Sequence, residues 1–95
     1  MSNECQANGP SVVEIKVTAS ECGAMPEGDT IILEGPAINY EKSGPVCITA
    51  LNAIYPWIIV SRFGVETDVL DFDTDNQCYH AVCPCGTVSF DIKKI

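Results

Sequence analysis

Basic residues are scarce in this sequence. Lysine and arginine together number 5 against 13 aspartates and glutamates, which gives a formal net charge of −8 at pH 7. This charge repels the phosphates of DNA and RNA, so we expect no nucleic-acid binding. The same charge attracts metal cations and basic partners, but an acidic balance is common and identifies neither of them.

Long hydrophobic runs are also missing. The most apolar window, 48–60, is interrupted by Asn52 and Pro56 and is too short to cross a bilayer. The first residues, MSNECQANGPS, contain neither a basic region nor an apolar core, so we expect no secretory signal there. We therefore expect a cytoplasmic protein with no membrane contact. In that compartment cysteines are more often metal ligands or reactive thiols than disulfides.

Common catalytic signatures are absent as well. The sequence has no Gly-rich phosphate loop, no Ser–His–Asp set and no HExxH pair, and it holds a single histidine. The run DFDTDN begins like an EF-hand calcium loop, but Asn76 stands where glycine is needed and Val82 where the bidentate glutamate is needed. We expect a solvated acidic loop here.

The patterns that are present predict one domain. We expect a disordered N-terminal tail over 1–10 and a single α+β domain over 11–95. Apolar and polar residues alternate in SVVEIKVT, 11–18, which predicts a strand with one wet face. Three further strands are expected over 30–34, 78–82 and 87–93.

One helix is expected between the two pairs of strands, over 47–62. Its predicted apolar stripe consists of Ile48, Leu51, Tyr55, Ile58 and Ile59. Pro56 inside this run should kink or divide the helix. The order ββαββ predicts a mostly antiparallel four-stranded sheet packed on one central helix.

Cysteine is the residue type that this chain has in excess, with six in 95 residues. Cys22 lies in a loop, where function is more common than in a core. Cys47 opens the expected helix, where unpaired amides and the helix dipole favour a thiolate. Cys83 and Cys85 flank Pro84, and in an extended chain their side chains would face the same side. Cys47 is equally consistent with a buried first-turn cysteine that has no chemical role. Cys83 and Cys85 are also consistent with small apolar fillers in a tight turn.

The remaining cysteines carry less weight. Cys5 lies in the expected tail, and we interpret it as an unpaired surface thiol. Cys78 faces the same side of its strand as His80, and we interpret it as core or edge filler. The two form a conceivable ligand pair, but a lone strand histidine is more often a satisfied structural side chain.

The separated cysteines and the block AIYPWIIVSRFG, 53–64, resemble a family of small three-cysteine proteins found mainly in anaerobic bacteria and archaea. The resemblance covers nearly everything from residue 11 to residue 95 and places the family pattern on Cys22, Cys47 and Cys83. The family has an acidic residue where this chain has Cys85. The resemblance implies a shared three-thiol site but no established activity.

Three hypotheses follow. In the first, thiolates of Cys22, Cys47 and Cys83 bind zinc, iron or an iron–sulfur cluster, with Cys85 or water in the fourth position. In the second, no metal is bound and Cys47 is a nucleophilic thiol, which is resolved by Cys22 or Cys83. In the third, the apolar segment 55–59 contacts a second subunit or another protein, so that the chain is a non-catalytic homo-oligomeric binding module. We favour the first hypothesis. The sequence names no substrate and no reaction.

Overall fold

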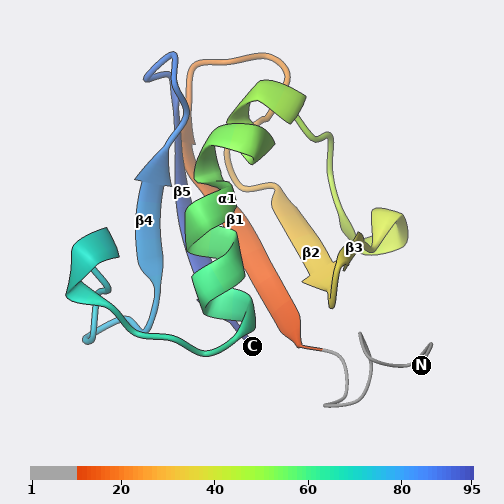
Figure 1. The fold of residues 1–95 in the computed structure, drawn as a ribbon. Helices are drawn as coiled ribbons and strands as arrows, with labels where there is room; N and C mark the ends of the chain where they lie inside the picture. The colour runs from red at the N-terminus through yellow and green to blue at the C-terminus, as the bar shows by residue number, and fades with distance from the viewer. Residues whose placement is uncertain (1–10) are drawn as a thin grey trace.

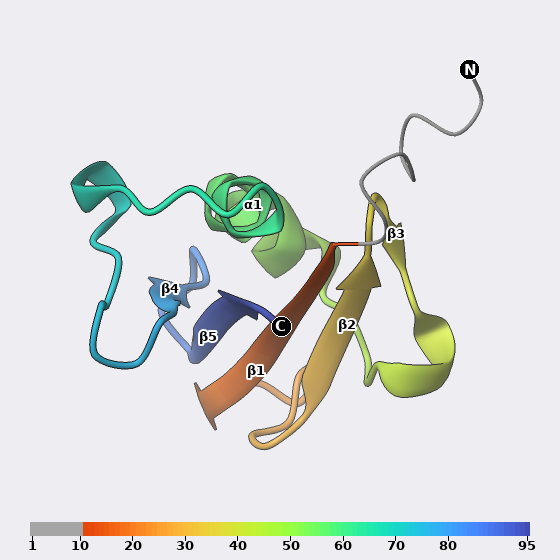
Figure 2. The same ribbon diagram turned by 90° about the horizontal axis from the view of Figure 1, so that it is seen from below.

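The computed structural model describes residues 11–95, so the tail expected over 1–10 lies outside the described residues. The elements, in chain order, are β1 (Val12–Ser20), β2 (Thr30–Glu34), β3 (Ala37–Ile38), η2 (Tyr40–Lys42), α1 (Ile48–Arg62), η3 (Asp68–Leu70), β4 (Tyr79–Val82) and β5 (Val88–Lys94). The strands form one sheet in the order β3-β2-β1-β5-β4, and every neighbouring pair is antiparallel. Helix α1 crosses one face of this sheet (Figures 1 and 2). The expected α+β class with one central helix is therefore confirmed.

The expected four-stranded sheet and ββαββ order are wrong by one strand. Gly35 adopts a positive φ of 61° and, with Pro36, reverses the chain so that Ala37 and Ile38 pair back onto β2. Glycine accepts this left-handed backbone without the steric penalty of a side chain. A strand of two residues is too short to show alternation, which is why the sequence pattern did not reveal β3.

The first and last strands pair at the centre of the sheet. β1 pairs with β5 over most of its length and with β2 on its other side. On the inner face of β1, Val13, Ile15 and Val17 are each at most 1% exposed and form the middle of the core. The alternation that predicted a strand here therefore also identified its buried face.

The buried face of α1 differs from the predicted stripe. The residues that α1 buries are Ala50, Ile54, Ile58 and Ser61. Of the predicted stripe, Ile48 is 80% exposed and Tyr55 is 52% exposed. The helix is apolar on several sides, so its spacing did not single out the face that meets the sheet. The helix also continues through Pro56 and is not divided there. In the range 11–95, no helix is both long and apolar enough to cross a membrane.

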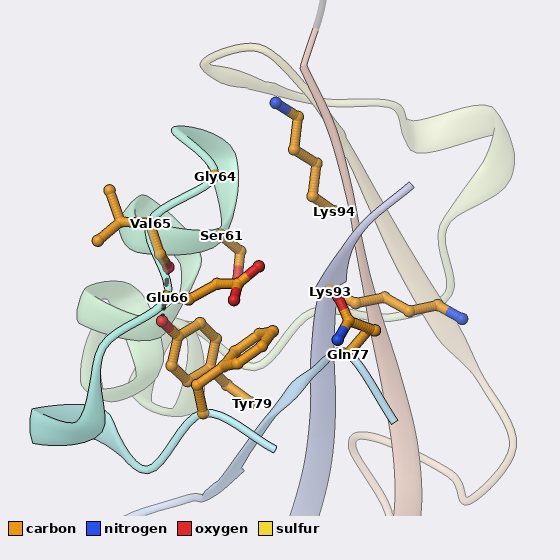
Figure 3. A pocket seen from close by; sticks show the side chains of 9 residues that line it. Ser61, Gly64, Val65, Glu66, Gln77, Tyr79, Lys93 and Lys94 are labelled. Atoms are coloured by element: carbon orange, nitrogen blue, oxygen red, sulfur yellow. Dashed lines mark hydrogen bonds between the residues drawn. The ribbon is translucent and has the colours of Figure 1, made fainter. Parts of the chain in front are cut away.

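The chain after α1 is fastened to the sheet by one buried tyrosine. Tyr79 on β4 is 1% exposed. Its hydroxyl donates to the Val65 carbonyl at 2.6 Å and accepts from the Thr67 amide at 3.1 Å. Figure 3 shows Tyr79 reaching toward Val65 at one side of a pocket. This hydroxyl is the hydrogen-bond partner of both backbone groups, so it fixes the position of the chain just after α1, at residues 65–67.

We expect Tyr79→Phe to lower the free energy of unfolding by about 1–3 kcal/mol, because the change removes two partly buried hydrogen bonds, each worth about 0.5–1.5 kcal/mol. Chemical denaturation measures this loss. Tyr55→Phe removes the same atom from a half-exposed ring and should change stability by less than about 0.5 kcal/mol. Equal effects of the two substitutions would contradict the fastening role of Tyr79.

Candidate functional site

Three segments that are distant in sequence meet at one end of the sheet. They are the loop after β1, the beginning of α1 and the turn between β4 and β5 (Figure 1). A cavity of about 140 Å³ lies among them, and Cys22, Cys47, Cys83 and Cys85 all line it. Its other walls are Met25, Thr49, Ala50, Pro84, Thr87 and Val88. The structure therefore brings the four cysteines singled out by the sequence around one cavity, which we call the thiol pocket.

Backbone hydrogen bonds hold the Cys22 loop against the β4–β5 turn. The amide of Glu21 donates to the Thr87 carbonyl at 2.8 Å. The Ser20 hydroxyl accepts from the Cys22 amide and donates to the Cys22 carbonyl, both at 3.1 Å. Met25, which is 2% exposed, anchors the loop in the core. Cys22 is therefore fixed at its backbone and only partly covered at its side chain.

Cys47 is placed by a close contact between two loops. It lies immediately before the first helical residue and makes no side-chain capping hydrogen bond. Upstream, Gly44 donates its amide to the Thr30 carbonyl at 2.9 Å. A Cβ at Gly44 would lie 2.5 Å from Oδ2 of Asp29, so any larger residue here would require the Asp29 side chain to move. The helix start and its thiol are thereby held beside the Cys22 loop.

The segment containing Cys83 and Cys85 is a tight turn and not an extended strand. The Gly86 amide donates to the Cys83 carbonyl at 2.9 Å, and Gly86 has a φ of 74°. Pro84 is the second residue of this turn, the position for which the fixed φ of proline is suited. Cys83 is consequently buried and Cys85 exposed. The argument that both thiols face one side of an extended chain is therefore wrong, although both line the pocket.

Local hydrogen bonds favour the ionised form of Cys83. Its Sγ lies 3.6 Å from the Thr87 hydroxyl. This hydrogen bond, aided by nearby backbone amides and opposed by burial, lowers the pKa of Cys83 to about 7. The structure thus gives Cys83 a specific reason for thiolate reactivity, which the sequence analysis had assigned to Cys47 from its place at the helix start.

The sulfurs of the thiol pocket surround the cavity without clustering tightly. The described cysteines are free thiols. Within residues 11–95, the group of three or more Cys, His, Asp or Glu ligand atoms that lie within 4.8 Å of one another is Asp73, Cys78 and His80. A metal ion shared by three pocket thiols therefore requires side-chain rotations that draw the sulfurs together.

The Asp73, Cys78 and His80 cluster lies on the sheet face opposite α1. His80 is exposed, whereas its strand neighbours Tyr79 and Ala81 point into the core. Nε2 of His80 lies 2.8 Å from Oδ2 of Asp73 and 4.0 Å from Sγ of Cys78. Nδ1 of His80 lies 2.6 Å from Oδ1 of Asp91 on β5.

Hydrogen bonds, charge and burial lower the pKa of Asp73 and raise the pKa values of His80 and Cys78. Hydrogen bonds from the Asn76 side chain and from His80 hold the pKa of Asp73 well below its usual range. The carboxylates of Asp73 and Asp91 raise the pKa of His80. Burial, followed by the two nearby carboxylates, raises the pKa of Cys78. The neighbouring carboxylates therefore favour the protonated imidazole of His80, and burial favours the neutral thiol of Cys78.

Sequence reasoning paired Cys78 with His80 but missed Asp73. It treated DFDTDN as a solvated loop, because the run fails as an EF-hand. The overlooked signal was the turn-forming stretch 74–77, which lets Asp73 pair with Cys78 when the chain returns to β4.

We expect the alkylation rate of Cys83 by iodoacetamide to rise with pH and reach half its maximum near pH 7, because the thiolate is the nucleophile. Thr87→Val keeps the side-chain shape but removes the hydroxyl, and should move this midpoint upward. Thr87→Ser should restore it. Tandem mass spectrometry resolves the modification at Cys83, and an unchanged midpoint in Thr87→Val would contradict this assignment.

Comparisons with known protein families, curated proteins and solved structures identify no relative of this chain. No family model matches the chain, no curated protein matches it, and no solved structure matches it. The resemblance to the three-cysteine family therefore stays a prediction, and function is argued from the two clusters of side chains.

Proposed function

We propose that this protein binds a thiophilic metal, either zinc or iron as an ion or an iron–sulfur cluster, through Cys22, Cys47 and Cys83. The observation that supports this most is the convergence of cysteines from three distant segments on one cavity of about 140 Å³. Thiolates in threes and fours are the usual ligands of zinc and of iron–sulfur clusters.

Burial and access at the pocket suit a site with one replaceable ligand. Cys83 is buried, and Cys22 and Cys47 are half-buried, so these three thiols have restricted positions. Cys85 is exposed on a turn at the same cavity and supplies the fourth ligand or leaves that position to water or a substrate. A site of this kind serves metal binding or delivery, or acts as a Lewis acid.

A second candidate function is metal-free thiol chemistry centred on Cys83. The Thr87 hydroxyl and the amides of the turn favour its thiolate. Cys22 and Cys47 line the same cavity and are the available resolving thiols. In this case the thiolate attacks an oxidised partner, such as a disulfide, and a second cysteine displaces that partner to form an internal disulfide.

Metal content after anaerobic purification tests the first proposal. We expect the thiol pocket to contribute about one metal ion or one cluster per chain by elemental analysis, and sulfur-to-metal charge-transfer absorption when Co²⁺ replaces the native metal. The triple variant Cys22→Ser, Cys47→Ser, Cys83→Ser should lose this contribution, and in a Cys78→Ser background it should lose both signals completely. Added metal should also raise the melting temperature of the wild-type protein, because a ligand that binds only the folded state stabilises it.

Cys78→Ser is the matched control, because Cys78 points away from the thiol pocket and lies in the cluster on the other face. This variant should keep the charge-transfer absorption of the pocket. In the Cys78→Ser variant, metal content at background, together with a melting temperature that metal does not change, would contradict the metal proposal. Reversible formation of one internal disulfide by that metal-free protein, measured by thiol counting with oxidised glutathione, would then support the second candidate.

A further inference from the structure

The cluster on the outer face of the sheet has the architecture of a second, separate cation site. Asp73 and Cys78 face each other across an antiparallel bridge and exchange both backbone hydrogen bonds, at 2.9 and 3.2 Å. Side chains of directly opposed residues lie on the same side of such a pair. His80 follows two residues after Cys78 in the strand direction and so points to that side as well. Backbone pairing alone therefore gathers the three side chains.

His80 is held in the orientation that metal-binding histidines commonly have. Its Nδ1 lies 2.6 Å from the carboxylate of Asp91, which leaves Nε2 directed at Asp73 and Cys78. Histidine ligands of metals usually donate their second ring N–H to a carboxylate, which fixes the ring and increases its basicity. Asp91 supplies that outer partner from β5, the strand next to β4.

The carboxylate of Asp73 is also held in a fixed orientation by hydrogen bonds within its own loop. Its Oδ1 accepts from the amides of Asp75 and Asn76, at 3.0 and 3.1 Å. Its Oδ2 accepts from the Asn76 side chain at 2.8 Å and faces His80. The loop thus fixes one oxygen and presents the other to the cluster.

The separations are close to those around a tetrahedral ion. Zinc bonds of about 2.0 Å to nitrogen and oxygen and about 2.3 Å to sulfur place ligand atoms roughly 3.3–3.6 Å apart. Here Nε2 of His80 lies 2.8 Å from Oδ2 of Asp73 and 4.0 Å from Sγ of Cys78. Shifts of about half an ångström bring these two distances to the required values, and all three ligand atoms lie within 4.8 Å of one another. The ion would replace the proton on Nε2 and the proton on the thiol.

We propose that Asp73, Cys78 and His80 bind a divalent transition-metal ion, with Zn²⁺ as the best match, at a site independent of the thiol pocket. One thiolate, one imidazole and one carboxylate suit zinc, whereas calcium and magnesium prefer oxygen ligands alone. Three protein ligands leave the fourth position open. A hollow of about 250 Å³, lined in part by Asn76, Cys78 and Asp91, gives a water molecule or a small anionic ligand room to reach that position.

The single histidine of the chain makes this proposal directly testable. The test uses the full chain with Cys22, Cys47, Cys83 and Cys85 replaced by serine, so that failure of the thiol pocket cannot affect the result. Zn²⁺ is titrated while the imidazole nitrogens are followed by NMR. We expect Nε2 to shift to a metal-bound value at one equivalent while Nδ1 keeps its proton, and a chelator to reverse the change.

Substitutions distinguish specific coordination of Zn²⁺ by these three side chains from general attraction of the cation to an acidic loop. Asp91→Asn should weaken Zn²⁺ binding about tenfold or more, as expected for loss of an outer-shell partner. Asp73→Asn should weaken binding further, and so should Cys78→Ser, with Cys78→Ala as an alternative if the serine variant does not fold. Asp75→Asn removes the same charge from the same loop and should change the affinity less than twofold. An imidazole that stays unshifted at tenfold excess of Zn²⁺, or equal effects of Asp73→Asn and Asp75→Asn, would overturn the proposal.

Discussion

The pairing of the first strand with the last is the constraint on which the rest of this structure depends. β1 and β5 lie side by side at the centre of the sheet, and their buried residues Ile15 and Ile92 face each other as partners with 0% exposure. The helix must then cross the sheet to connect β3 at one edge with β4 at the other. That crossing places the start of α1 and the β4–β5 turn at the same end as the loop after β1 (Figure 1). The thiol pocket is a consequence of topology.

Much of this architecture could be predicted from the sequence, because a strand with one buried face shows a regular alternation of apolar and polar residues. The four longer strands and the helix lie within a few residues of their expected ranges. The two failures have physical causes. β3 consists of two residues and has no period to detect. The helix carries apolar side chains on several sides, so the choice of Ile54 over Tyr55 for burial depends on the sheet that it meets, and helix spacing does not contain that information.

The residues of the two candidate sites were predictable to different degrees, because only some of them stand out from their sequence neighbours. Isolated cysteines in a loop, at a helix start and in a turn are unusual placements, so Cys22, Cys47 and Cys83 stood out before their convergence was known. Asp73 did not, because one aspartate among several in an acidic run carries no individual signal. Its partnership with Cys78 arises from a backbone bridge between two single residues, and the turn-forming stretch 74–77 indicates a chain reversal without identifying which residues pair.

Strand alternation has a final consequence for the chemistry of the two clusters. Along β4, Tyr79 and Ala81 face the helix side and the core, while His80 faces the opposite side. The same short strand therefore leads into the thiol pocket through Cys83 and supports the outer cluster through His80. The sheet separates a pocket that is rich in sulfur from an outer cluster of mixed ligands, in which His80 is exposed and Cys78 is buried. Thiolate-rich sites favour soft metal ions and mixed nitrogen, oxygen and sulfur sites favour borderline ions, so the two proposals together would give one small sheet two chemically distinct sites without enlarging its core.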